Sequence, residues 1–106
     1  MTDQAIQISR VTGGVDTHKD THTAAALDGT GRAVGNATFA ASPSGYVQLL
    51  AWLRGFGRLD RVGIEGTGSY GSGLAAHLRR QGVTVIEVNR PNRQARRRHG
   101  KSDPAD

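Results

Sequence analysis

The stretch that decides the fold is residues 11–27, which read VTGGVDTHKDTHTAAAL. Two short runs within it, 11–18 and 21–27, are separated by a polar break and predict two consecutive strands. A turn at residues 28–31, Asp-Gly-Thr-Gly, then leads into a third strand over 33–39. Three consecutive strands with short connections predict an antiparallel meander.

The second half of the chain alternates helices with strands. Ser42 and Pro43 supply an N-cap and a favoured first helical residue, and an apolar face with helical spacing follows as far as Gly55. The remaining elements are expected in the order strand, helix, strand, over residues 61–65, 70–81 and 83–88. The predicted order is therefore βββαβαβ, an α/β fold with a mixed five-stranded sheet whose later strands run parallel.

Four acidic residues fall where a metal site could assemble. Asp16 and Glu65 each follow a short apolar run, so both carboxylates are expected where a buried strand gives way to a loop. Asp103 and Asp106 are three residues apart and share one face if their segment is helical. Carboxylate oxygens suit Mg²⁺ or Mn²⁺, and two such ions about 4 Å apart can support phosphodiester cleavage by water.

The loop after Glu65 offers a second kind of ligand. Residues 66–70 read GTGSY and precede a predicted helix. A flexible loop with free backbone amides at a helix N-terminus is a place where phosphate can bind. Glycine turns of this kind are common at helix starts, so the loop alone is a weak signal.

These blocks resemble the N-terminal, RuvC-like domain of the DEDD transposases of bacterial insertion sequences, the insertion-sequence-110 family. The matching stretches are residues 14–22, 64–70, and 88–91 through to 101–106. The resemblance implies a ribonuclease-H-like fold, in which the first and fourth strands lie side by side. It also implies a catalytic, metal-binding tetrad of Asp16, Glu65, Asp103 and Asp106, with Mg²⁺ or Mn²⁺ as cofactor.

The same resemblance sets the expected function and partners. It implies a DNA transposase or recombinase that acts on phosphodiesters, with DNA as partner, a structured guide RNA as a further partner and a homo-oligomer in the full-length protein. We expect residues 1–10 to form a tail and residues 11–106 one nuclease domain, truncated at its C-terminal end. Family members continue into a second domain with a catalytic serine, so this chain alone is expected to be nearly inactive.

Positive charge is concentrated near the end of the chain. Lys and Arg number 14 against 9 Asp and Glu, a net charge of +5, which favours a polyanionic partner. The residues predicted to bind nucleic acid are Arg90, Arg93, Arg96, Arg97, Arg98 and Lys101. Such side chains hold phosphate oxygens without reading sequence. No aromatic residue lies in this tract, so contact with the backbone is a better explanation than base stacking.

Composition excludes several other classes of protein. The chain has no cysteine, which rules out disulfides and thiolate metal sites. No apolar run approaches the ~18 residues of a membrane span, and the N-terminus lacks the features of a signal peptide. The expected location is the bacterial cytoplasm, with no membrane partner.

The histidines raise an alternative metal site. Residues Asp16, His18, Asp20 and His22 alternate, and in one continuous strand they would share a face that could bind zinc or manganese. A turn near Asp20 would break up that face. We expect such a turn, or an exposed strand edge, for Asp20 and His22.

Three other functions are alternatives to that of a transposase. An actin-like or sugar-kinase ATPase needs a glycine-rich phosphate turn, which residues 17–20 lack, and a second lobe that 106 residues cannot provide. A RuvC-type Holliday-junction resolvase is a nearer alternative, although residues 65–70 and 101–106 fit the transposase pattern better. A non-catalytic nucleic-acid-binding remnant of a transposase is the third alternative.

Overall fold

The structure, a computed structural model, describes residues 9–89 of the chain. In chain order its elements are β1 (Arg10–Thr17), β2 (Thr21–Leu27), β3 (Ala33–Ala40), α2 (Pro43–Arg54), β4 (Arg58–Glu65), α3 (Ser72–Arg80) and β5 (Thr84–Val88). This order, βββαβαβ, confirms the α/β arrangement predicted from the sequence. Neither of these helices is long and apolar enough to cross a membrane.

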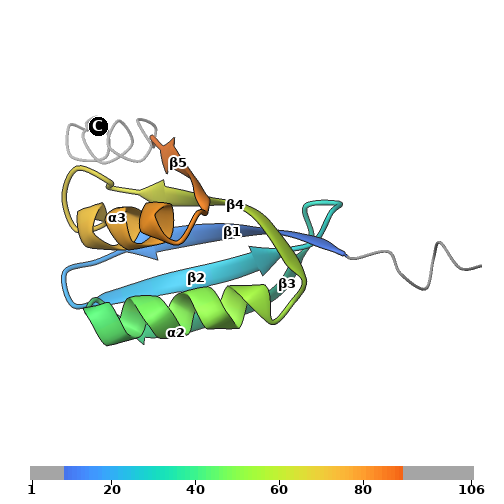
Figure 1. Cartoon of the computed structure of the whole chain (residues 1–106), viewed down its shortest axis with the longest axis horizontal. Helices are drawn as coiled ribbons and strands as arrows, with labels where there is room; N and C mark the ends of the chain where they lie inside the picture. The colour runs from blue at the N-terminus through green and yellow to red at the C-terminus, as the bar shows by residue number, and fades with distance from the viewer. Residues whose placement is uncertain (1–8, 90–106) are drawn as a thin grey trace, which may run out of the picture.

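The five strands form one mixed sheet in the order β3-β2-β1-β4-β5 (Figure 1). The first three strands form the expected antiparallel meander, while β4 runs parallel to both β1 and β5. Helix α2 makes the connection from β3 to β4, and α3 connects β4 to β5. The arrangement fits the ribonuclease-H-like fold and sets β1 beside β4, although 40 residues separate the end of β1 from the start of β4.

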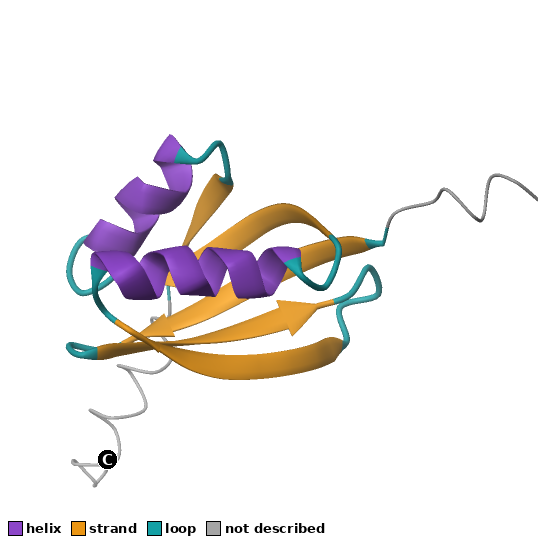
Figure 2. Ribbon diagram, turned by 60° about the horizontal axis from the view of Figure 1, so that its bottom comes forward, coloured by secondary structure: helices purple, strands orange, loops and turns teal. Residues whose placement is uncertain are grey.

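Both helices cover the same face of the sheet (Figure 2). Alternate strand residues such as Val15, Ala24 and Ile64 point to this face and pack against leucines such as Leu49 and Leu74. Burying a leucine or isoleucine side chain contributes roughly 1.5–3 kcal/mol, so this layer supplies most of the stabilisation. The residues between them along each strand lie on the opposite face, which neither α2 nor α3 covers.

Local signals explain where α2 begins. The Oγ of Ser42 accepts a hydrogen bond from the amide of Gly45 at 3.2 Å, and Pro43 occupies the first helical turn. Gly45 is buried against the main chain of β3, where a Cβ would collide with the carbonyl oxygen of Ala40. The cap and this close approach fix the angle at which α2 leaves the sheet.

Two boundaries differ from the sequence prediction by two residues or more. β4 begins at Arg58, three residues earlier than the predicted 61, because the amide of Arg58 bonds the carbonyl of Ser9 and Leu59 pairs with Val11. The second helix begins at Ser72, so the prediction that it starts at Tyr70 was wrong. Tyr70 belongs to the preceding turn, and 56% of its surface is exposed.

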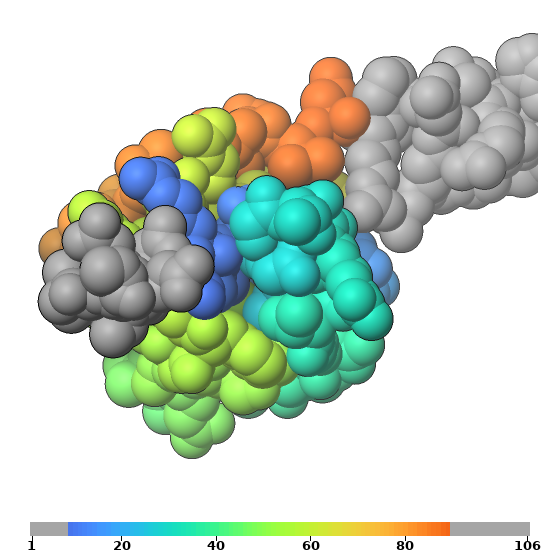
Figure 3. All heavy atoms as spheres, turned by 90° about the vertical axis from the view of Figure 1, so that its right-hand side faces the viewer, coloured from blue at the N-terminus to red at the C-terminus, as the bar shows by residue number. Residues whose placement is uncertain are grey.

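The end of the molecule at which β1 begins is closed by polar turns (Figure 3). In the predicted turn between β2 and β3, coloured teal, Oδ1 of Asp28 accepts hydrogen bonds from the amides of Thr30 at 2.9 Å and Arg32 at 3.0 Å. Asp60 lies at the start of β4 and pairs with Arg10 across a 3.8 Å separation. Asp28 and Asp60 therefore stabilise the turns at this end of the molecule. The candidate site lies at the other end of β1.

Candidate metal centre

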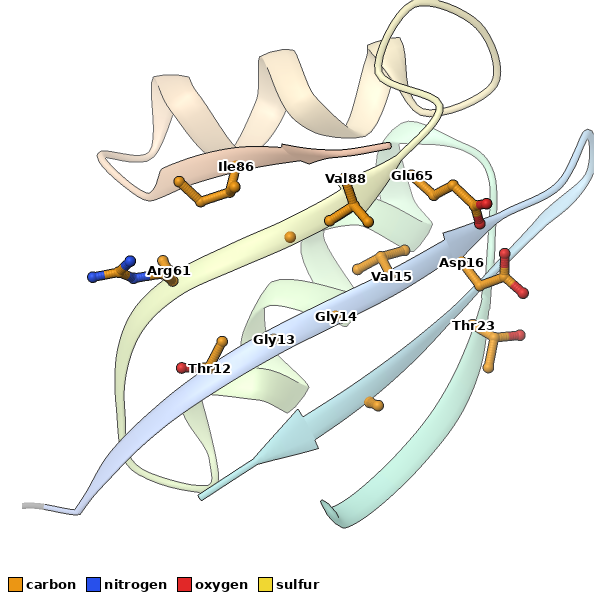
Figure 4. Close-up of a pocket in the computed structure, with 12 residues that line it drawn as sticks. Thr12, Gly13, Gly14, Val15, Asp16, Thr23, Arg61, Glu65, Ile86 and Val88 are labelled. Atoms are coloured by element: carbon orange, nitrogen blue, oxygen red, sulfur yellow. The ribbon is translucent and has the colours of Figure 1, made fainter. Parts of the chain in front are cut away.

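Asp16 and Glu65 stand at the carboxyl ends of two neighbouring parallel strands. The register pairs Gly14 of β1 with Gly63 of β4, and then Val15 with Ile64. The next position on each strand is Asp16 and Glu65, whose side chains lie on the face opposite the helices because strand residues alternate. Figure 4 shows both carboxylates at the same end of this face. The predicted adjacency of the two strand ends is therefore confirmed.

Both acidic side chains are half-buried, and Oδ1 of Asp16 and Oε1 of Glu65 are shielded from solvent. Ionised carboxylates on adjacent strands repel each other, and this repulsion is stronger away from bulk water. A divalent cation between them would offset it, since carboxylate oxygens are the ligands that Mg²⁺ and Mn²⁺ prefer. The donor atoms that the structure brings together thus fit a hard divalent ion.

A threonine ties the two strand ends together. The Oγ1 of Thr17 donates a hydrogen bond of 2.7 Å to the carbonyl oxygen of Glu65. This contact fixes the main chain next to Asp16 against the main chain of Glu65. Sequence reasoning missed it, because the two residues are 48 positions apart and a threonine after an aspartate carries no signal of its own.

The loop after Glu65 is folded back on itself. The carbonyl oxygen of Gly66 accepts hydrogen bonds from the amides of Ser69 at 3.0 Å and Gly71 at 2.8 Å. Gly66 has a φ of 75°, a left-handed conformation that favours glycine. The prediction of free amides for phosphate in residues 66–70 was wrong for Ser69, because its amide donates within the loop.

A groove of about 520 Å³ runs along the sheet face that carries the two carboxylates (Figure 4). Its floor is low because Gly14 and Gly63 lack side chains at paired positions of β1 and β4. A Cβ at Gly14 would meet no atom within 4 Å, whereas one at Gly63 would lie 2.9 Å from Cγ2 of Val88. Arg61 lies toward the other end of this groove from Asp16 and Glu65.

The alternative histidine site does not form. A turn after β1, closed by a 2.9 Å hydrogen bond from the amide of His18 to the carbonyl of Thr21, breaks the alternation and leaves Asp20 exposed as predicted. His22 was expected in this turn or at an exposed edge, which is wrong, since it is fully buried under the helices. Its ring stacks on Tyr46 with centroids 5.9 Å apart.

His22 is buried because side chains of β2 alternate between the two faces of the sheet, and His22 falls on the face that the helices cover. His22, Ala24 and Ala26 point toward the helices, on the opposite face of the sheet from Asp16. Burial lowers the pKa of His22, although a contact with the carbonyl of Thr21 at 3.0 Å acts in the other direction. The histidine is therefore a core residue and not a ligand beside Asp16.

Within residues 9–89 there is no group of three or more His, Cys, Asp or Glu side chains that could hold a metal. Asp16 and Glu65 are thus two candidate ligands of a site that needs further ones. The other two predicted ligands, Asp103 and Asp106, lie outside the described residues and stay predictions. So do the six basic residues predicted to bind nucleic acid, which are Arg90, Arg93, Arg96, Arg97, Arg98 and Lys101.

Comparison with known proteins gives a family. The transposase model for DEDD transposases of insertion sequence 110 matches residues 13–106 of the chain. The matched span begins in β1 and contains every residue predicted for the site, from Asp16 to Asp106. The comparison with individual curated proteins gave no match.

Proposed function

The chain belongs to the insertion-sequence-110 family of DEDD transposases, and on that premise we propose that it is the metal-dependent domain that cuts and transfers DNA strands. One observation carries the proposal. Asp16 and Glu65, far apart in sequence, stand at the ends of the adjacent parallel strands β1 and β4 and line the same groove. A family match alone supports transposition; this placement of two carboxylates supports metal-dependent chemistry.

The residues of this chain would hold and orient the metal. Asp16 and Glu65 offer oxygen ligands from two rigid strands whose ends are joined through Thr17, so little reorganisation is needed on binding. When bound, Mg²⁺ or Mn²⁺ lowers the pKa of its water and stabilises the oxygen that leaves phosphorus. Half-burial of both carboxylates strengthens their attraction to a cation, because screening by bulk water is reduced.

The further metal ligands and the DNA-binding residues are proposed from the family and from the positive charge of residues 90–101. Asp103 and Asp106 would complete the metal ligands, and the basic residues from Arg90 to Lys101 would hold the DNA backbone next to them. A structured guide RNA and assembly of the full-length protein into a homo-oligomer are further proposals that family membership supports. Because the family resemblance implies a second domain whose serine takes part in strand exchange, we expect little activity from the 106 residues alone.

A nicking assay tests this proposal. The chain and a version extended with the following segment of a family member are incubated with branched or single-stranded DNA and Mg²⁺, Mn²⁺ or a chelator. We expect divalent-dependent nicking by the extended protein, and its loss in Asp16→Asn and Glu65→Gln, which remove a charge with little change in shape.

Two substitutions serve as matched controls for the nicking assay. Asp20→Asn alters an exposed aspartate of the β1–β2 turn, and Glu87→Gln alters an exposed glutamate of β5. Both variants should nick at the wild-type rate. Nicking that survives Asp16→Asn would show that the metal site is misassigned, whereas DNA binding without any nicking would favour the non-catalytic remnant.

A further inference from the structure

Tyr70 differs from every other aromatic side chain of this protein. The chain has two Tyr, two Phe and one Trp. Four of them pack in ring contacts, namely Phe39 with Trp52, Trp52 with Phe56, and Tyr46 with His22 and His77. Tyr70 makes no ring contact with any residue between 9 and 89, and 56% of its surface is exposed. It is therefore available to a ring from another molecule.

The loop that carries Tyr70 is fixed against the main chain of Glu65, one of the two candidate metal ligands. Its two neighbours in sequence are both fixed, since the amides of Ser69 and Gly71 bond the same carbonyl oxygen, that of Gly66. Gly71 is buried, and a Cβ there would lie 3.0 Å from the carbonyl oxygen of Glu65. The main chain of Tyr70 is thus fixed close to the main chain of Glu65.

An exposed aromatic residue on a fixed loop that follows Glu65 suits an unpaired nucleobase. Every base has a π-face, so stacking on a tyrosine is tolerant of sequence. Because the loop is already ordered, little conformational entropy is lost when the ring is covered. Phosphate alone would not use this ring, and the loop amides of Ser69 and Gly71 are already occupied by Gly66.

We propose that Tyr70 is a positioning residue that stacks on an unpaired base next to the phosphate that a metal ion on Asp16 and Glu65 would hold. This inference rests on the proposed action on DNA and adds a preference for strands with an unpaired base at the site. The proposal assigns base stacking and contact with the DNA backbone to two different parts of the chain. Stacking would take place in the loop after β4, and the arginine tract, which has no aromatic residue, would contact the backbone.

Binding of a fluorescent base tests the proposal without any cleavage step. The probes are a DNA duplex with a short bulge that contains 2-aminopurine and the same duplex fully paired, each titrated with the 106-residue chain in Ca²⁺, an oxygen-binding divalent ion that stands in for Mg²⁺. Tyr70→Leu should weaken binding of the bulged probe about 5- to 150-fold, the effect of losing one stacked base, and should leave the paired probe unchanged. Tyr70→Phe keeps the ring and should bind within about twofold of wild type.

A matched control removes an equally exposed apolar side chain elsewhere. Val47 is also 56% exposed but lies on α2, so Val47→Ala should bind both probes as wild type does. Equal affinity of wild type and Tyr70→Leu for the bulged probe would overturn the proposal. So would an equal loss on both probes, or a wild-type chain that binds neither. The nicking assay tests the metal chemistry separately, so failure of the stacking proposal and failure of the proposed function can be told apart.

Discussion

Replacing Thr17 with valine tests how the two strand ends are joined. The change removes one hydrogen bond of 2.7 Å to the carbonyl of Glu65 and keeps the branched shape that favours a strand. A hydrogen bond of this kind contributes about 1 kcal/mol net, in a range of roughly 0.5–1.5 kcal/mol. In a domain of this size a loss of 1 kcal/mol lowers Tm by about 4–8 °C.

Thermal unfolding followed by circular dichroism measures this difference. Thr17→Ser, which keeps a hydroxyl, should recover part of the lost stability. Thr38→Val is the matched control, because its hydroxyl meets that of Thr23 at 3.0 Å on an exposed surface, where the loss should stay below about 0.5 kcal/mol. An unchanged Tm in Thr17→Val would refute the reasoning that this contact holds β1 to β4, as would an equal loss in Thr38→Val.

Three further predictions concern the core, the loop and the basic tract. Burial lowers the pKa of His22 from its ordinary value near 6.5, so the unfolded chain binds a proton first and stability should fall as pH drops from about 6.5 through the lower folded pKa. Urea midpoints measured against pH should show this fall, and His22→Phe should flatten it. Gly71→Ala places a Cβ 2.9 Å from the carbonyl oxygen of Gly66 and should cost roughly 1–3 kcal/mol in urea unfolding, whereas Gly68→Ala, with open space around it, should cost far less. Changing Arg96, Arg97 and Arg98 to Ala should flatten the salt dependence of duplex binding, whose log–log slope is about −0.9 per phosphate contact; an unchanged slope would exclude this tract as the contact surface.

The order of elements and the placement of Asp16 and Glu65 at strand ends could be predicted from the sequence because their signals are local. The cap at Ser42 and Pro43 marks α2, and the turn at residues 28–31 marks the end of β2. Each carboxylate directly follows a short apolar run. The family resemblance then placed the first strand beside the fourth, which no local signal could do.

The features that were missed depend on contacts between distant residues. Tyr70, Leu74 and Leu78 have the spacing of one helical face, which predicted a helix from residue 70. The carbonyl of Gly66 instead accepts hydrogen bonds from the amides of Ser69 and Gly71, so the helix begins only at Ser72. The alternation of β2 is equally visible, yet only packing against the helices decides that His22 faces inward. A shift of one residue in the strand would exchange the side chains that are buried with those that are exposed.

Iron-directed cleavage tests most directly whether Asp16 and Glu65 bind the same divalent ion. Fe²⁺ replaces Mg²⁺ in the 106-residue chain, and ascorbate with peroxide produces hydroxyl radicals that cut the main chain beside the bound ion. We predict cuts near both residue 16 and residue 65, lost together in either Asp16→Asn or Glu65→Gln and retained in Asp20→Asn and Glu87→Gln. Cuts near only one of the two strand ends, or cuts that persist in Asp16→Asn, would contradict a shared metal site.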